Sequence, residues 1–215
     1  MKRWLWLTAA SDSHTPMLMK HFLPSWGRHL EPHSELQCEP LAGHCGSFGE
    51  DAFNEMGRKS VLRMVRKVRE NEGRPMIVSG CDFHFYADFI AEVEAALEGH
   101  DLVGLNDVYG PVCGDFLAFN ASAKIADLFA WIHAHDPAFP NEQYTLNAAI
   151  AALGLQARLL PDTFWTYGLE GRGTWSFGQP VHPPAGMRLH HANFTIGAEN
   201  KMALLDAVAE AVGDA

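Results

Sequence analysis

Hydrophobic positions along the chain fall into two alternating patterns, short apolar runs and longer stripes at helical spacing. The short runs, typical of buried strands, lie at residues 4–9, 75–79, 101–105, 112–119, 156–160 and 187–191, and residues 35–41 could form a further strand. The helical stripes begin after Pro16 and continue at 50–72, 88–97, 121–133, 141–153 and 201–212. Strands that alternate with helices indicate an α/β fold with a mostly parallel sheet. We expect residues 1–215 to form a single domain.

Composition narrows the classes of function. The chain is 47% hydrophobic and 20% charged, as expected for a globular protein with a sizeable core, and its net charge is −10 with histidine neutral. This acidic balance argues against a nucleic-acid partner, because binding a phosphate backbone needs clustered positive charge. It is compatible with a small phosphorylated ligand held by a metal ion, backbone N–H groups and a few basic residues.

The cysteines and the N-terminal residues give information on the cellular compartment of the protein. Cys38, Cys45, Cys81 and Cys113 show no CxxC spacing, so we interpret them as reduced thiols of a cytoplasmic protein. The N-terminal residues resemble a signal peptide, but their apolar run, Trp4 to Leu7, is shorter than the usual ~7–15 residues. A first strand is the better interpretation, and no apolar run reaches the ~20 residues that span a membrane.

The sequence SGCDFHF, residues 79–85, places an acid and a histidine where a buried strand ends. In extended backbone, side chains at i and i+2 share one face, so Asp82 and His84 are expected to lie together. Carboxylate suits Mg²⁺ and Mn²⁺, and Mn²⁺ also accepts imidazole. The alternative is an Asp that caps a turn beside a half-buried His.

A second polar group follows the last apolar run. His191, Asn193, Gly197 and Lys201 lie within HHANFTIGAENK, residues 190–201. A helix that starts near Ala198 directs N–H groups at an anion, and Lys201 adds a positive charge. The alternative is a loop with a capping Asn.

The order of these motifs resembles the GT-A-fold nucleotide-diphospho-sugar transferases, a group of glycosyltransferases. The pieces are Lys59, SGCDFHFY, HDLVGLND, VCGDFLAFN, NEQYTLN, LLPDTFW and HHANFTIGAENKMALL, from about residue 50 to 206. The resemblance implies a GT-A-like α/β domain with a central, mostly parallel mixed sheet flanked by helices. It also implies one antiparallel strand near Gly114.

The resemblance implies a nucleotide-diphosphate-sugar donor and a divalent metal bound by Asp82, His84 and His191. The family motif is Asp-x-Asp, whereas this chain has Asp82-Phe83-His84. Two imidazoles and one carboxylate favour Mn²⁺ over Mg²⁺. The missing second carboxylate leaves open whether a metal is required at all.

The remaining implied roles concern the donor and the reacting centre. The implied donor-binding residues are Thr8, Ala9, Ala10, Lys59, Asp107, Gly114, Asn193, Gly197 and Lys201, and the implied catalytic residues are Asp115, Glu142 and Gln143. The expected reaction is metal-assisted, retaining transfer of the sugar to an acceptor of unknown type: glycan, lipid or protein. Association with a membrane is expected only through that acceptor.

Two other functions remain open at this point. The Asp-x-His motif is compatible with a GT-A-like protein that binds nucleotide-sugars without a metal or without catalysis. More distantly, Asp82, His84 and His191 form the ligand set of a metal-dependent hydrolase.

Overall fold

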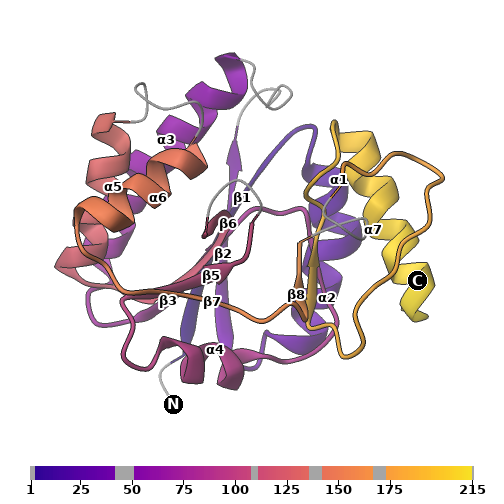
Figure 1. The fold of residues 1–215 in the computed structure, drawn as a ribbon, viewed down its shortest axis with the longest axis horizontal. Coiled ribbons are helices and arrows are strands. Elements are labelled where there is room, and N and C mark those ends of the chain that lie inside the picture. The colour runs from indigo at the N-terminus through magenta and orange to yellow at the C-terminus, as the bar shows by residue number, and fades with distance from the viewer. Residues whose placement is uncertain (1–2, 42–50, 108–110, 136–141, 167–172, 215) are drawn as a thin grey trace.

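The computed structural model describes residues 3–41, 51–107, 111–135, 142–166 and 173–214, without the side chains of residues 51–56, 58, 59 and 142. These residues form layers that Figure 1 shows from the side. Helices α3, α5 and α6 lie on one side of a central sheet, and a small sheet with α1, α2 and α7 lies on the other. No described helix is both long enough and apolar enough to cross a membrane.

The central sheet has six strands in the order β2-β1-β3-β6-β5-β7. Their bounds are β1 Trp4–Ser11, β2 Ser34–Leu41, β3 Pro75–Ser79, β5 Leu102–Leu105, β6 Cys113–Asn120 and β7 Ala157–Leu159. β1 pairs in parallel with β2 and β3, and β5 pairs in parallel with β7. β6 is antiparallel to both of its neighbours, β3 and β5. The predicted α/β fold and the antiparallel strand at Gly114 are therefore confirmed.

Helices cover one face of the central sheet because alternate strand residues point to it. In β1, Leu5 and Leu7 lie in a core with Met64 and Val68 of α3, whereas Trp4 and Trp6 face the other way. The helices on the first face are α3 Asp51–Glu70, α5 Ala123–His135 and α6 Glu142–Ala152. Their apolar stripes, visible in the sequence, match this packing.

The second face of the central sheet packs against a smaller sheet of three strands, in the order β4-β9-β8. These are β4 Phe83–Phe85, β8 Phe164–Trp165 and β9 Leu189–His191. Around them lie α1 Thr15–Met17, the π-helix η1 Leu18–Phe22, α2 Leu23–His29, α4 Ile90–Leu97 and α7 Ala198–Val212. One continuous core joins both sheets, because Trp6, Phe83 and Leu189 belong to the same buried cluster.

The small sheet was not expected from the sequence. The run at 187–191 predicts a final strand, which is confirmed as β9, but β9 pairs with β4 and β8 rather than with the central sheet. The residues of β9 are apolar or buried because helices cover one face of the small sheet and the central sheet covers the other. Strands of two and three residues, such as β8 and β4, are too short to show a period in the sequence.

Trp6 lies at the centre of the core between the two sheets. Its ring makes edge contacts with Phe22, Phe85, Phe89 and Phe116 at centroid distances of 5.1–6.3 Å. Its indole N–H donates to Ser79 Oγ over 2.8 Å. The Trp6 side chain therefore links β1 to η1, β3, β4, β6 and the residue that precedes α4.

Replacing Trp6 by Ala is expected to lower the free energy of unfolding by about 3–5 kcal/mol, because it leaves a large cavity among aromatic rings. Urea unfolding followed by circular dichroism measures the change. Phe177→Ala is the matched control, since that ring is 79% exposed, and it should change stability by less than about 0.5 kcal/mol. Similar losses in both variants would contradict the central packing role of Trp6.

Candidate active site

A cavity of about 240 Å³ opens at the carboxyl ends of β1 and β3. Ligands of open α/β sheets bind at such strand ends. Its lining includes the polar residues Thr8, Ser11, His14, Arg63, Asp82, Asp115 and Lys201, together with Ala9, Gly80 and Gly114. The cavity therefore collects groups from β1, α3, β6, α7 and the turn after β3.

Asp82 is the centre of the charged wall. It lies in the turn between β3 and β4, where the Lys201 ammonium contacts its Oδ2 atom. His191 Nε2 lies 3.5 Å from the same oxygen. The Ala192 N–H donates to the Asp82 backbone carbonyl over 3.0 Å, which holds the turn against the end of β9. Three segments far apart in sequence thus meet at one carboxylate.

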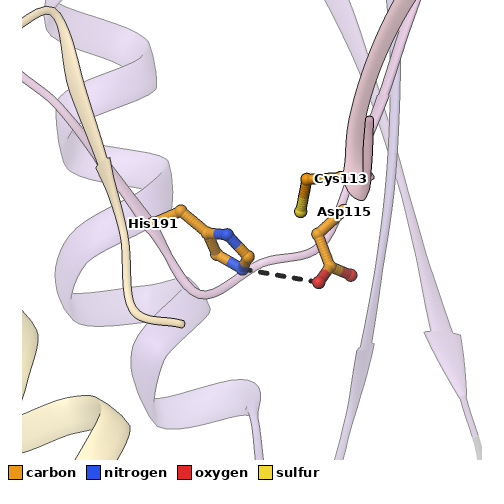
Figure 2. A group of neighbouring side chains, drawn as sticks. All are labelled: Cys113, Asp115 and His191. Carbon is orange, nitrogen blue, oxygen red and sulfur yellow. Dashed lines mark ion pairs between the residues drawn. The ribbon is translucent and has the colours of Figure 1, made fainter. Parts of the chain in front are cut away.

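His191 points from β9 toward the start of β6, as Figure 2 shows. Its Nε2 atom lies 3.6 Å from Asp115 Oδ2, beside Cys113. The ring is fully buried and stacks on Phe83 at 4.3 Å, while Nδ1 pairs with Thr166 Oγ1 over 2.9 Å. The stacking and the Thr166 contact fix the ring so that Nε2 faces two carboxylates.

The two carboxyl groups differ in their tendency to ionise. Burial opposes ionisation of Asp82, but the Lys201 and His191 charges outweigh it and hold the pKa of Asp82 well below its usual value. Loss of water around Asp115, reinforced by the Asp82 charge, raises the pKa of Asp115, although half of its side chain is exposed to the cavity. For Lys201, burial is outweighed by Asp82 and Asp115, which raise its pKa and keep the ammonium charged.

The donor set at this site fits a divalent metal. Among the described residues, Cys113, Asp115 and His191 each offer an atom within 4.8 Å of the others. Asp82 reaches the same imidazole nitrogen, and that nitrogen is buried without a hydrogen-bond partner among the described residues. Burial and the neighbouring acids raise the pKa of the Cys113 thiol, which disfavours the thiolate that binds metals. Asp82, Asp115 and His191 are therefore the side chains that suit a hard cation.

His84 lies elsewhere, which corrects the expectation that it shares a face with Asp82. Its Nδ1 atom pairs with His21 and its Nε2 atom with Asp214, on the side of the small sheet away from Phe83 and the central sheet. The i, i+2 rule holds only inside a strand, and Asp82 precedes β4. The backbone position beside the Asp82 carboxylate is Gly80, where an added Cβ would lie 2.7 Å from Asp82 Oδ1.

The other expected donor-binding residues divide into two groups. Thr8, Ala9, Gly114 and Lys201 line the cavity, and Thr8 Oγ1 donates to the Gly80 carbonyl over 3.0 Å. Within the described part of the chain, the cavity wall does not include Ala10, Asp107, Asn193 and Gly197.

These four residues have structural partners instead. Ala10 packs into the core between the sheets. Asn193 Nδ2 donates to Asp107 Oδ2 over 3.1 Å, and Gly197 begins α7 with a positive φ of 88°. Asp107 and Asn193 thus contact each other outside the cavity wall.

Two of the three expected catalytic residues, Gln143 and Asp115, are placed by the structure. The Gly114 N–H donates to Gln143 Oε1 over 3.3 Å, so the start of α6 holds the backbone beside Asp115. The side chains of Lys59, its neighbour Arg58, and Glu142 lie outside the described residues.

Arg63 of α3 was not identified from the sequence, because it looks like one of many basic residues on a helix surface. It lines the cavity and pairs with Glu39 over 2.8 Å through Nη1. Its Nε atom is buried without a hydrogen-bond partner among the described residues. The cavity therefore contains a second cation besides Lys201.

No protein-family model and no curated protein matches the chain, whereas solved structures do. One is a glycosyltransferase involved in the glycosylation of the major capsid of PBCV-1, with TM-score 0.64, 10% identity, and coverage of 94% of this chain and 98% of that one. Another is mouse xyloside xylosyltransferase 1, with TM-score 0.56, 10% identity, and coverage of 89% and 98%.

A third match is the glycosyltransferase GlyE of Streptococcus pneumoniae TIGR4, with TM-score 0.50 and 13% identity. The match covers 76% of this chain but only 46% of GlyE, so the chain spans about half the length of that protein. Together these structures establish that the chain has a glycosyltransferase fold of the GT-A type. At such low identities, the reaction has to be argued from the site.

Proposed function

We propose that the protein transfers a sugar from a nucleotide-diphosphate-sugar donor to an acceptor. The observation that carries the proposal is the meeting of Lys201, Asp82, His191 and Asp115 at one strand-end cavity. A diphosphate needs positive charge, and this cavity supplies it in an otherwise acidic protein. The position of the cavity at the carboxyl ends of β1 and β3, where open α/β sheets bind ligands, supports this proposal.

The chain's own residues have distinct roles in this proposal. Lys201 and Arg63 attract the donor diphosphate, and Lys201 stabilises the charge of the leaving nucleotide as the glycosidic bond breaks. Asp82, Asp115 and His191 would hold a divalent metal, which supplies Lewis-acid stabilisation of that same leaving group. Mn²⁺ fits a mixed carboxylate and imidazole set better than Mg²⁺ does. Thr8 and Ala9 border the nucleoside.

Retention of the anomeric configuration is part of the proposal. Of the described residues that line the cavity, the only carboxylates are Asp82 and Asp115, and both face cationic or metal-binding partners. Neither is free to deprotonate an acceptor from the opposite side of the sugar, as inversion requires. The anomeric configuration of the product, read by proton NMR, tests this step.

A thermal-shift panel of UDP-, GDP-, ADP- and CMP-sugars, each with and without Mn²⁺, tests donor binding. A ligand at about 100 times its Kd adds roughly 2.7 kcal/mol of stability. We expect one nucleotide to stabilise the protein, and Mn²⁺ to increase the effect. Release of that nucleotide in the presence of an acceptor mixture of glycans, lipid-linked sugars and peptides would establish transfer. No stabilisation by any nucleotide-sugar would refute the proposal.

Arg63→Gln is expected to weaken donor binding about tenfold, because one cation near the diphosphate is lost. Isothermal titration calorimetry with the nucleotide identified by the panel measures this change. Arg66→Gln is the matched control on the same helix, since Arg66 is exposed and pairs with Glu70 at 3.6 Å. If the Arg63→Gln and Arg66→Gln variants bind the donor nucleotide with equal affinity, Arg63 does not contact the donor.

The second candidate is a protein that binds nucleotide-sugars without a metal. It is favoured by the contact between Lys201 and Asp82, which already neutralises the carboxylate that a metal would use. Donor binding that is identical with and without Mn²⁺ would support this candidate. Asp82, His84 and His191 do not form the ligand set of a hydrolase, because His84 contacts His21 and Asp214 instead of the other two residues.

A further inference from the structure

A second group of histidines lies on the far side of the small sheet from the candidate active site. His21 of η1 and His84 of β4 face each other with their Nδ1 atoms 3.0 Å apart. Both rings are nearly fully buried, at 3% and 6% exposure. This pair joins the N-terminal helical segment to the strand that follows Asp82.

Each ring is held from behind by a carboxylate of the C-terminal segment. His21 Nε2 lies 2.8 Å from Asp206 Oδ1, and His84 Nε2 lies 3.0 Å from Asp214 Oδ2. Asp206 also pairs with Lys20 over 2.6 Å, and Asp214 with Arg28 over 2.5 Å. Both carboxylates are therefore ionised acceptors, and each needs a proton on the imidazole nitrogen that faces it.

Counting the protons on the two rings leaves none between the two Nδ1 atoms. A neutral imidazole carries one proton, and the carboxylates require that proton on Nε2. Both Nδ1 atoms consequently present lone pairs to each other across 3.0 Å in a buried site. Such an arrangement needs a positive species between the two nitrogens, either an additional proton or a metal ion.

The geometry around the pair matches that of a metal centre. Histidine ligands of metals usually donate their other ring N–H to a carboxylate, as both rings do here. Two nitrogens bound to a tetrahedral Zn²⁺ at 2.0–2.1 Å lie about 3.3 Å apart, within a few tenths of an ångström of the observed separation. Imidazole is also a preferred ligand of Zn²⁺.

A third imidazole lies close by and has no assigned partner. His190 is directly opposite His84 in the pairing of β4 with β9, so the two side chains share one face of the small sheet. Neither of its ring nitrogens has a hydrogen-bond partner among the described residues, although the ring is fully buried. A buried imidazole with two unpaired nitrogens is costly unless a ligand joins it.

We propose that His21 and His84 bind a Zn²⁺ ion through their Nδ1 atoms, with a reoriented His190 as the third ligand. Asp206 and Asp214 orient the two rings from α7 and the residues that follow it. Figure 1 shows α7 beside α1 and α2, so the ion would fasten the C-terminal helix to the small sheet. Because α7 carries Lys201, the ion would also steady the candidate active site. The metal site itself does not depend on the proposed sugar transfer.

The test begins with the full chain, stripped with a chelator and titrated with Zn²⁺ or with Co²⁺ as a spectroscopic probe. We expect a site that binds Co²⁺ with the intense visible bands of tetrahedral coordination, bands that the His84→Gln variant loses, and a rise in melting temperature with Zn²⁺. X-ray absorption of the Zn²⁺ form should show nitrogen neighbours at about 2.0–2.1 Å and no sulfur. A sulfur neighbour at about 2.3 Å would instead place the ion at Cys113 and overturn the proposal.

Variants locate the ion within the chain. His84→Gln should weaken Zn²⁺ binding at least 100-fold, and His190→Gln about tenfold. His133→Gln, on the exposed surface of α5, should leave the affinity unchanged. If His84→Gln fails to fold, the X-ray absorption of the native chain still decides. Absence of Zn²⁺ binding by the native chain would mean that a proton lies between the two rings, and would refute the proposal.

Discussion

Replacement of Asp82 by Asn is expected to lower the rate of sugar transfer at least about 100-fold, comparable to the loss of one group that stabilises transition-state charge. Asp82 is the buried carboxylate that both Lys201 and His191 contact. Asn keeps the size of the side chain but removes its charge. The site then loses its attraction for a divalent metal, and Lys201 loses the partner that positions its ammonium.

Initial rates of nucleotide release at saturating donor, with and without Mn²⁺, measure the effect. Asp127→Asn is the matched control, because Asp127 is an exposed residue of α5 that does not line the cavity. The control should keep the native rate. If Asp82→Asn retains both the rate and its dependence on Mn²⁺, Asp82 is not part of the metal site.

The periodicity of the sequence predicts most of the fold, because strand and helix periods depend on burial alone. β1, β3, β5 and β6 correspond to short apolar runs, whereas β2 and β7, the two edge strands, are less apolar and partly exposed. The strand predicted at 187–191 is confirmed as β9, but a run of buried residues does not reveal which sheet the strand joins. Pairing partners are set by tertiary contacts, such as the stacking of Phe83 on His191.

Only some residues of the candidate site can be predicted from the sequence. Polar residues at strand ends indicated Asp82 and His191, and a Lys after a glycine indicated Lys201. The position of His84 depended on where the strand begins, and a shift of a single residue moves a side chain to the other face. Arg63 and Cys113 have no local signal, because one is a helical Arg among several and the other a buried strand residue.

Replacement of Lys201 by Gln is expected to have two separate effects. Donor affinity should fall about 100-fold, because the main cation at the diphosphate is lost. The free energy of unfolding should also fall by about 3–5 kcal/mol, because Asp82 is left as a buried charge without its closest cation. Calorimetry with the donor nucleotide and urea unfolding measure the two effects.

Lys124→Gln is the control for the stability effect, since Lys124 also pairs with an aspartate, Asp101, over 3.1 Å, but its side chain is 63% exposed. An exposed pair contributes less than about 1 kcal/mol, so this variant should stay close to the native stability. A loss of equal size in both variants would show that burial does not strengthen the pair of Lys201 and Asp82.

The double variant Asp82→Asn with Lys201→Gln separates structure from function at this site. It removes both charges together, so no unpaired charge stays buried, and the unfolding free energy should recover most of the loss seen with Lys201→Gln alone. Donor binding and transfer should not recover, because the diphosphate still lacks its cation. Recovery of donor affinity in the double variant would show that Lys201 serves only to neutralise Asp82, and that the donor binds through other residues.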